Sequence, residues 1–209
     1  KKIWNLFDLQ GRTAVVTGGS GVLCGEMARA LGRAGANVVV MARGWEVVEA
    51  VAKDIRDEGG KALALACDVL DERALLRARE QIVNHFGGLE ILVNGAGGNH
   101  AEATTSAERT FFDLEIDALR SVLDLKLLMA ASFHPMTRVP AYAAAKAAIN
   151  NFTEWLAVYM AQEYVGQIRV NAIAPGFFIA QQNHDLLIQP DGQWTERGQK
   201  ILDHTPAGR

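Results

Sequence analysis

Cysteine, proline and aromatic residues are scarce in this chain of 209 residues, and it has neither a block of like charge nor a long apolar run. Two cysteines, Cys24 and Cys67, are too few for a disulfide framework, which favours a reducing compartment such as the cytoplasm. The 21 basic and 24 acidic residues are dispersed, so we expect no nucleic-acid or membrane-surface partner. No segment is apolar for long enough to span a bilayer, and the first residues lack the pattern of a signal peptide. The five histidines show no metal-ligand spacing, so we expect no metal site.

Short apolar, β-branched segments alternate with amphipathic ones along the chain. We expect strands at 13–17, 37–41, 62–66, 91–93 and 168–173, and helices at 22–33, 45–57, 72–86, 141–164 and 195–202. This alternation predicts βαβ units and a parallel sheet covered on both faces. The length suits one large domain, so the predicted fold class is α/β, with residues 1–209 forming a single Rossmann-type doubly wound domain.

The turn after the first expected strand, from Thr17 to Gly25, is rich in glycine. Glycine lets the backbone approach a pyrophosphate closely, and the next helix directs its unpaired N–H groups and positive dipole end at that charge. A glycine cluster alone would also suit an ordinary tight turn, but its place after the first strand of a βαβ unit favours dinucleotide binding. The candidate cofactor contacts in this turn are Gly18, Ser20, Gly21, Val22 and Leu23.

Tyr142 and Lys146 are four residues apart on the expected helix, so the two side chains share a face. A nearby ammonium lowers the pKa of a phenol, which would make the phenolate accessible near neutral pH. Such a pair can move a hydroxyl proton while a nicotinamide moves a hydride, although a tyrosine and a lysine at this spacing also occur without any chemistry. Asn94-Gly95-Ala96-Gly97 follows one expected strand, and the segment from Asn171 to Gly176 contains the end of another. Both lie at the edge where open α/β sheets bind ligands.

Together these features resemble the short-chain dehydrogenase/reductase family, and Asp68-Val69 resembles the family's adenine-side pair. The resemblance implies a nicotinamide dinucleotide cofactor, a small-molecule substrate and a homodimer or homotetramer formed through helices such as 141–164. It implies that Tyr142 is the general acid/base and that Lys146 tunes it and holds the nicotinamide ribose. The further cofactor contacts that it implies are Asp68, Val69, Asn94, Ala96, Gly97, Tyr142, Lys146, Pro175, Gly176 and Phe178. Segments 151–158 and 171–177 are most similar to D-mannonate oxidoreductases, which implies a sugar acid such as D-mannonate or D-fructuronate as the substrate.

The second expected strand ends at Met41-Ala42-Arg43 without the carboxylate that would bind the ribose hydroxyls of NAD. The guanidinium of Arg43 could pair with a 2′-phosphate, so NADP(H) is favoured, with NAD(H) as the alternative. A sugar-acid carboxylate needs cationic or amide partners. The candidates, each of which would also suit an ordinary surface position, are His100, Gln182, Asn183, His184 and Arg197, and His134 is similarly ambiguous.

Four positions depart from the family pattern. Val22 and Cys24 stand where the family has its second and third turn glycines, with Gly21 one place early, and we expect Cys24 to be a small packing residue rather than a reactive thiol. Met129 stands where the family has its catalytic serine, and Ser132 is out of register. Lys126 stands where the family has an asparagine that orders a proton-relay water.

A missing segment would account for the lost serine. The chain passes from Leu128 directly into Met129-Ala130 without the strand that the family has between those expected at 91–93 and 168–173. A sheet that lacks this inner strand would leave backbone hydrogen-bonding groups unpaired in its core. We therefore predict that the natural chain carries additional residues near 128–130, near Ser106 and after Arg209. The alternatives to a sugar-acid enzyme are a reductase of another sugar acid or of a 3-oxoacyl substrate, and a dinucleotide-binding sensor without catalytic activity.

Overall fold

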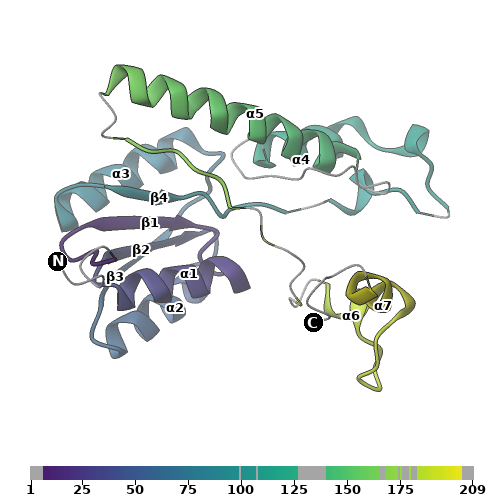
Figure 1. The fold of residues 1–209 in the computed structure, drawn as a ribbon, viewed down its shortest axis with the longest axis horizontal. Coiled ribbons are helices and arrows are strands. Elements are labelled where there is room, and N and C mark those ends of the chain that lie inside the picture. Colours follow the sequence, from purple (N-terminus) through teal and green to yellow (C-terminus); the bar gives the residue numbers. More distant parts are fainter. Residues whose placement is uncertain are drawn as a thin grey trace. The chain divides into compact units, whose positions relative to one another are not determined.

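Figure 1 shows the computed structural model of the chain, which describes residues 7–98, 100–106, 108–126, 140–164, 168–173, 175, 179 and 183–203. The chain divides into two compact units, Lys1–Ala172 and Ile173–Arg209. None of the helices in these described ranges combines the length and the apolar character needed to cross a membrane.

The first unit contains a four-stranded parallel sheet in the order β3-β2-β1-β4. The strands are β1 (Thr13–Thr17), β2 (Asn37–Ala42), β3 (Lys61–Ala66) and β4 (Ile91–Val93). All five residues of β1 are buried, because this strand lies between β2 and β4 and is covered on both faces. The predicted fold class, an α/β parallel sheet with helices on both sides, is confirmed.

Helices α1 (Val22–Arg33) and α2 (Trp45–Asp57) cover one face of this sheet, and α3 (Glu72–Phe86) covers the other (Figure 1). Alternate strand residues supply the two cores, since successive side chains of a strand point to opposite faces. Val16, Val38 and Val40 pack with α1 and α2. Val15, Val39 and Leu65 pack with α3.

Glu90 fixes the amino-terminal end of the β1–β4 pair. Its carboxylate Oε2 accepts a hydrogen bond from the Thr13 amide at 2.7 Å, and its own amide donates to the Thr13 carbonyl oxygen at 3.0 Å. Both strands therefore begin from one reciprocal contact, which sets their register.

After β4, the regular secondary structure described in the first unit is helical. The short 3-10 turns η2 (Ala101–Ala103) and η3 (Phe111–Asp113) precede α4 (Ile116–Lys126), and α5 (Pro140–Glu163) follows. A small cluster of Ala103, Ala118, Val122 and Ala141 joins η2, α4 and α5. The expected helix at 141–164 is thus confirmed to within one residue, whereas α4 was not among the expected elements.

The strand expected at 168–173 is wrong. These residues adopt no regular structure, and Ile168 and Ile173 are exposed. A strand exists through hydrogen bonding to a neighbour, and within the described residues the sheet ends at β4. The apolar, β-branched sequence therefore lacks the partner that would make it a strand.

The second unit contains α6 (His184–Leu187) and α7 (Glu196–Asp203). Between these two helices, Ile188 and Trp194 form an antiparallel bridge. Gly198 of α7 packs so closely that an added β-carbon would lie 2.4 Å from the Leu187 carbonyl oxygen. The expected helix at 195–202 is confirmed with a shift of one residue, and α6 was not expected.

Candidate functional site

The glycine turn after β1 folds back against the end of β4. Gly18 has a φ of +63°, which side chains disfavour, and an added β-carbon would lie 2.3 Å from the Gly95 carbonyl oxygen. The Gly21 amide donates to the Gly18 carbonyl oxygen at 2.9 Å and closes the turn. Gly21, one place early relative to the family pattern, has an ordinary φ of −76°.

The start of α1 suits a phosphate group. Gly21 is the N-cap, and no side chain in the described part of the chain caps the helix or places an acid in its first turn. The first amide groups of α1 therefore keep their hydrogen-bonding capacity and their partial positive charge. With the close approach of Gly18 and Gly95, this backbone cradle fits the pyrophosphate of a dinucleotide.

Thr17 connects the turn to the segment after β4, a role that sequence reasoning missed. Its hydroxyl accepts hydrogen bonds from the amides of Gly95 at 2.9 Å and Ala96 at 3.2 Å, and it donates to the Val93 carbonyl oxygen at 3.4 Å. Thr17 is almost fully buried. The polar residue at the end of an otherwise apolar strand was the available signal.

Two predicted cofactor residues lie exposed at the ends of β2 and β3. Arg43 follows β2 immediately and precedes Gly44, the N-cap of α2. Asp68 follows β3, and its Oδ1 accepts a hydrogen bond from the Leu70 amide at 3.0 Å. Because the strands are parallel, both residues lie at the same sheet edge as the glycine turn.

Tyr142 and Lys146 lie in the first turns of α5, and the Lys146 Nζ is 5.4 Å from the centroid of the Tyr142 ring. Lys146 is only 9% exposed, and Tyr142 is half-buried beside the cluster that joins α4 and α5. Burial raises the pKa of Tyr142 and lowers the pKa of Lys146. The expectation that the ammonium lowers the phenol pKa is therefore wrong for the protein alone, because desolvation is the larger effect.

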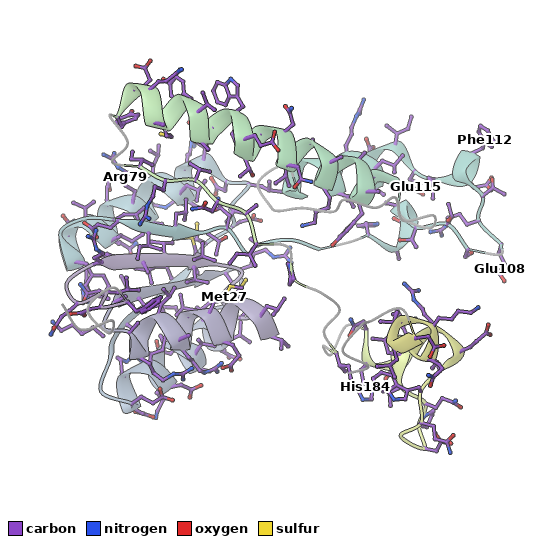
Figure 2. All side chains as sticks on the ribbon, viewed as in Figure 1. Met27, Arg79, Glu108, Phe112, Glu115 and His184 are labelled. Atoms are coloured by element: carbon purple, nitrogen blue, oxygen red, sulfur yellow. The ribbon has the colours of Figure 1, made fainter. Side chains whose placement is uncertain are left out.

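The candidate substrate residues belong to both units of the chain. His100 caps η2 through its Nδ1, which accepts a hydrogen bond from the Glu102 amide at 3.3 Å. Asn183 and His184 begin α6 in the second unit, where His184 Nδ1 lies 3.1 Å from Asp185 Oδ1 (Figure 2). Pro175 and Arg197 are exposed in the same unit.

Several predicted positions lie outside the described residues. These are Gly176, Phe178, Gln182, Met129, Ser132, His134 and the 128–130 junction. Among the described residues no group of three or more histidine, cysteine or acidic side chains could hold a metal ion.

The family model for short-chain dehydrogenases matches residues 12–127 and 129–189. An uncharacterized oxidoreductase of Bacillus subtilis (strain 168) is 44% identical over an alignment that covers 97% of this chain and 84% of the relative. That alignment extends over 235 positions, so the relative has residues at 26 or more positions where this chain has none.

Two solved structures are also similar. A Haemophilus influenzae protein described as a D-mannonate oxidoreductase, with bound NAD, is 39% identical with a TM-score of 0.90, covering 100% of this chain and 86% of that chain. A Beutenbergia cavernae protein described as an NAD(P)-dependent gluconate 5-dehydrogenase, with NADP at low occupancy, is 31% identical with a TM-score of 0.80. It covers 97% of this chain and 85% of that chain.

The family match spans most of the chain and includes the glycine turn, the Asn94–Gly97 segment and the Tyr142–Lys146 pair. The resemblance seen in the sequence is thus confirmed. The chain belongs to the short-chain dehydrogenase family and is an NAD(P)-dependent oxidoreductase with a Rossmann-type fold.

Proposed function

We propose that the protein interconverts a secondary alcohol and a ketone of a sugar acid, such as D-mannonate and D-fructuronate. Support comes from the two similar structures, which are described as enzymes of hexonic acids. His100, Asn183, His184 and Arg197 are the described candidates for binding the substrate carboxylate and hydroxyls. A sugar acid offers many groups to such amides and cations, whereas a 3-oxoacyl chain would offer few.

We assign the proton transfer to Tyr142, and the observation that carries this is its pairing with the buried Lys146. Because burial raises the pKa of Tyr142, the phenol holds its proton at neutral pH and can donate it to a carbonyl oxygen during reduction. When bound, the dinucleotide supplies the hydride for that reduction. Lys146 would hold the nicotinamide ribose and stabilise the phenolate that remains.

The experiment is a screen of hexonates and ketohexuronates with both oxidised and reduced cofactors. We expect turnover with sugar acids and a loss of about a thousandfold or more in Tyr142→Phe, since the donor proton is removed. Tyr159→Phe on the same helix is the matched control and should keep its activity. Full turnover by Tyr142→Phe would contradict the role of the phenol.

The cofactor preference is proposed to be NADP(H), with NAD(H) as the alternative because one similar structure binds NAD. Arg43 makes no ion pair within the described residues, so its guanidinium is available for a 2′-phosphate. Arg43→Ala should lower kcat/KM for NADPH about tenfold or more and leave that for NADH within about twofold. A wild-type preference for NAD(H) would overturn this assignment.

A second candidate function is a dinucleotide-binding sensor without turnover. It is favoured by the sequence position thirteen residues before Tyr142, where Met129 replaces the family's serine. Dinucleotide binding together with no turnover on any sugar acid or 3-oxoacyl substrate would support it.

We further propose that the natural chain carries a strand-forming segment at the Leu128 junction. The family match is interrupted at Leu128, and relatives have residues at 26 or more positions that this chain lacks. Within the described sheet β4 is an edge strand with an apolar sequence, its Leu92 is 54% exposed, and the strand-like residues 168–173 are unpaired. The same expectation near Ser106 stays a prediction.

Insertion of the Haemophilus influenzae relative's residues after Leu128 tests this proposal, with an equally long glycine–serine insertion as the control. We expect the relative's segment to slow hydrogen exchange of the β4 amides that do not bond to β1 and to raise turnover, and the control insertion to do neither. Slow exchange of those same amides in the 209-residue chain itself would show that the free edge of β4 is already covered and would contradict the proposal.

The exposed face of α5 is proposed to mediate self-association. Phe152, Trp155 and Tyr159 stack in series, with centroid distances of 5.9 and 5.3 Å, and all three are exposed. This uncharged aromatic face can pair with the same face of a second copy about a twofold axis. A homodimer or homotetramer follows from such pairing.

A further inference from the structure

The side chain of Cys24 lies against the backbone of Gly95. Cys24 is in the first turn of α1, and Gly95 is the second residue after β4. A β-carbon on Gly95 would lie 2.0 Å from the Cys24 Sγ and 2.4 Å from the Thr17 carbonyl oxygen. The thiol therefore fills the space that any side chain at position 95 would need.

In dinucleotide-binding turns a glycine on the helix commonly permits close packing against a strand. Here the corresponding close approach joins a side chain on the helix to a glycine after the strand. The small residue that the contact requires has thus moved to the β4 side. The neighbouring Gly25 does not take over this role, because an added β-carbon there would meet nothing closer than 3.3 Å.

Two opposing contacts fix the distance between the start of α1 and the segment after β4. The Thr17 hydroxyl holds the Gly95 and Ala96 amides by hydrogen bonds, and the Cys24 thiol limits how closely Gly95 approaches the helix. Burial raises the pKa of Cys24, so the thiol is neutral at neutral pH and acts through its volume.

We propose that Cys24 is a positioning residue, whose thiol volume sets through Gly95 the spacing between the phosphate cradle of α1 and the Asn94–Gly97 segment. The proposal rests on the proposed function in one respect, namely that the dinucleotide binds across these two segments. A larger side chain at position 24 then displaces the segment after β4 and weakens binding of the nicotinamide half. The adenosine half, which Arg43 and Asp68 would hold, keeps its contacts.

The experiment measures the dissociation constants of NADPH and of adenosine 2′,5′-bisphosphate for Cys24→Val, Cys24→Ser and the wild type. We expect Cys24→Val to bind NADPH about tenfold or more weakly and the bisphosphate within about twofold of the wild type, because overpacking shifts backbone locally. Cys24→Ser, nearly the same size, should stay within about threefold for both ligands. Val48→Ala, in the core between α2 and the sheet, is the control for lost stability alone and should leave both constants unchanged.

Equal NADPH affinity of Cys24→Val and the wild type would overturn the positioning role. The positioning role would also be overturned if Cys24→Val lost affinity equally for NADPH and for the bisphosphate, or if Val48→Ala lost as much affinity for NADPH as Cys24→Val does. Either result would indicate general destabilisation of the protein. Failure of the wild type to bind either NADPH or NADH would instead contradict the proposed function, so the two failures are distinguishable.

Discussion

Among single residues, Thr17 shows how one side chain fixes the geometry of two loops. Its hydroxyl is the acceptor for the Gly95 and Ala96 amides in a part-buried setting. Thr17→Val keeps the shape and removes the acceptor, so we expect the free energy of unfolding to fall by about 1–3 kcal/mol and dinucleotide binding to weaken. Urea unfolding and NADPH titration measure both effects. Thr17→Ser keeps the hydroxyl, so its free energy of unfolding and its NADPH affinity should fall much less. If Thr17→Val changed neither quantity, the role of the hydroxyl as an acceptor would be contradicted.

The titration of Tyr142 is the second prediction for a single residue. Burial raises the pKa of its phenol above the usual value of about 10. The difference between the alkaline absorbance titrations of the wild type and Tyr142→Phe should therefore show a midpoint above pH 10. A midpoint below 10 would mean that the Lys146 ammonium outweighs desolvation.

Burial shifts the pKa of Lys146 in the direction opposite to that of Tyr142. Its pKa in the folded protein is lowered by burial, so the unfolded chain binds more protons between that lowered pKa and the usual 10.4 or so. The free energy of unfolding should rise with pH across this interval in the wild type. Unfolding measured at several alkaline pH values should show a smaller rise in Lys146→Met, and an identical rise in both proteins would contradict the prediction.

The sequence predicted which residues form the turn and the Tyr142–Lys146 pair, because both are short-range patterns. It could not predict the direction of the pKa shifts, since these depend on burial, and residues that pack around Tyr142, such as Ala118 and Val122, lie far from it in the sequence. The contacts of Thr17 and Cys24 with Gly95 were missed for the same reason, as they join segments some 70 positions apart.

Among the helices of the first unit, α1 and α2 pack closely at Gly32. A β-carbon on Gly32 would lie 2.7 Å from the Ile55 Cγ2, and Ile55 is almost fully buried. Gly32→Ala should therefore lower the free energy of unfolding by about 1–3 kcal/mol, although alanine is the better helix former. In an Ile55→Ala background, Gly32→Ala should lower the free energy of unfolding much less. A double-mutant cycle, measured by urea unfolding, gives the coupling energy between positions 32 and 55. Additive effects would show that the contact is not strained by the extra methyl group.

The elements of the first 93 residues were predictable because each strand and helix follows its own local pattern of apolar residues. The strand expected at 168–173 was wrong because pairing is not a local property, and its neighbour is absent from the described sheet. Helix α6 has only four residues, too few for a periodic pattern, and α4 follows a loop without a clear N-cap signal.

For the molecule as a whole, the aromatic face of α5 determines the expected assembly. Trp155 lies at the centre of the stack and is 57% exposed. Trp155→Glu should lower the mass measured by light scattering to that of a smaller oligomer or a monomer, because a buried unpaired charge opposes association. Leu76→Glu, at a similarly exposed position on α3, is the control and should leave the mass unchanged. Equal masses for the wild type and Trp155→Glu would exclude this face as the interface.

The β1–β4 pair is held by side chains at both of its ends, Glu90 at the start and Thr17 at the finish. A slip of one residue would break both sets of hydrogen bonds together and would turn the apolar side chains of β4 to the wrong face. The backbone position from which a loop grafted after Gly97 begins should therefore stay the same whatever the length or sequence of the loop. This strand pair offers protein engineers an anchored position at which substrate loops can be exchanged while the nucleotide cradle keeps its shape.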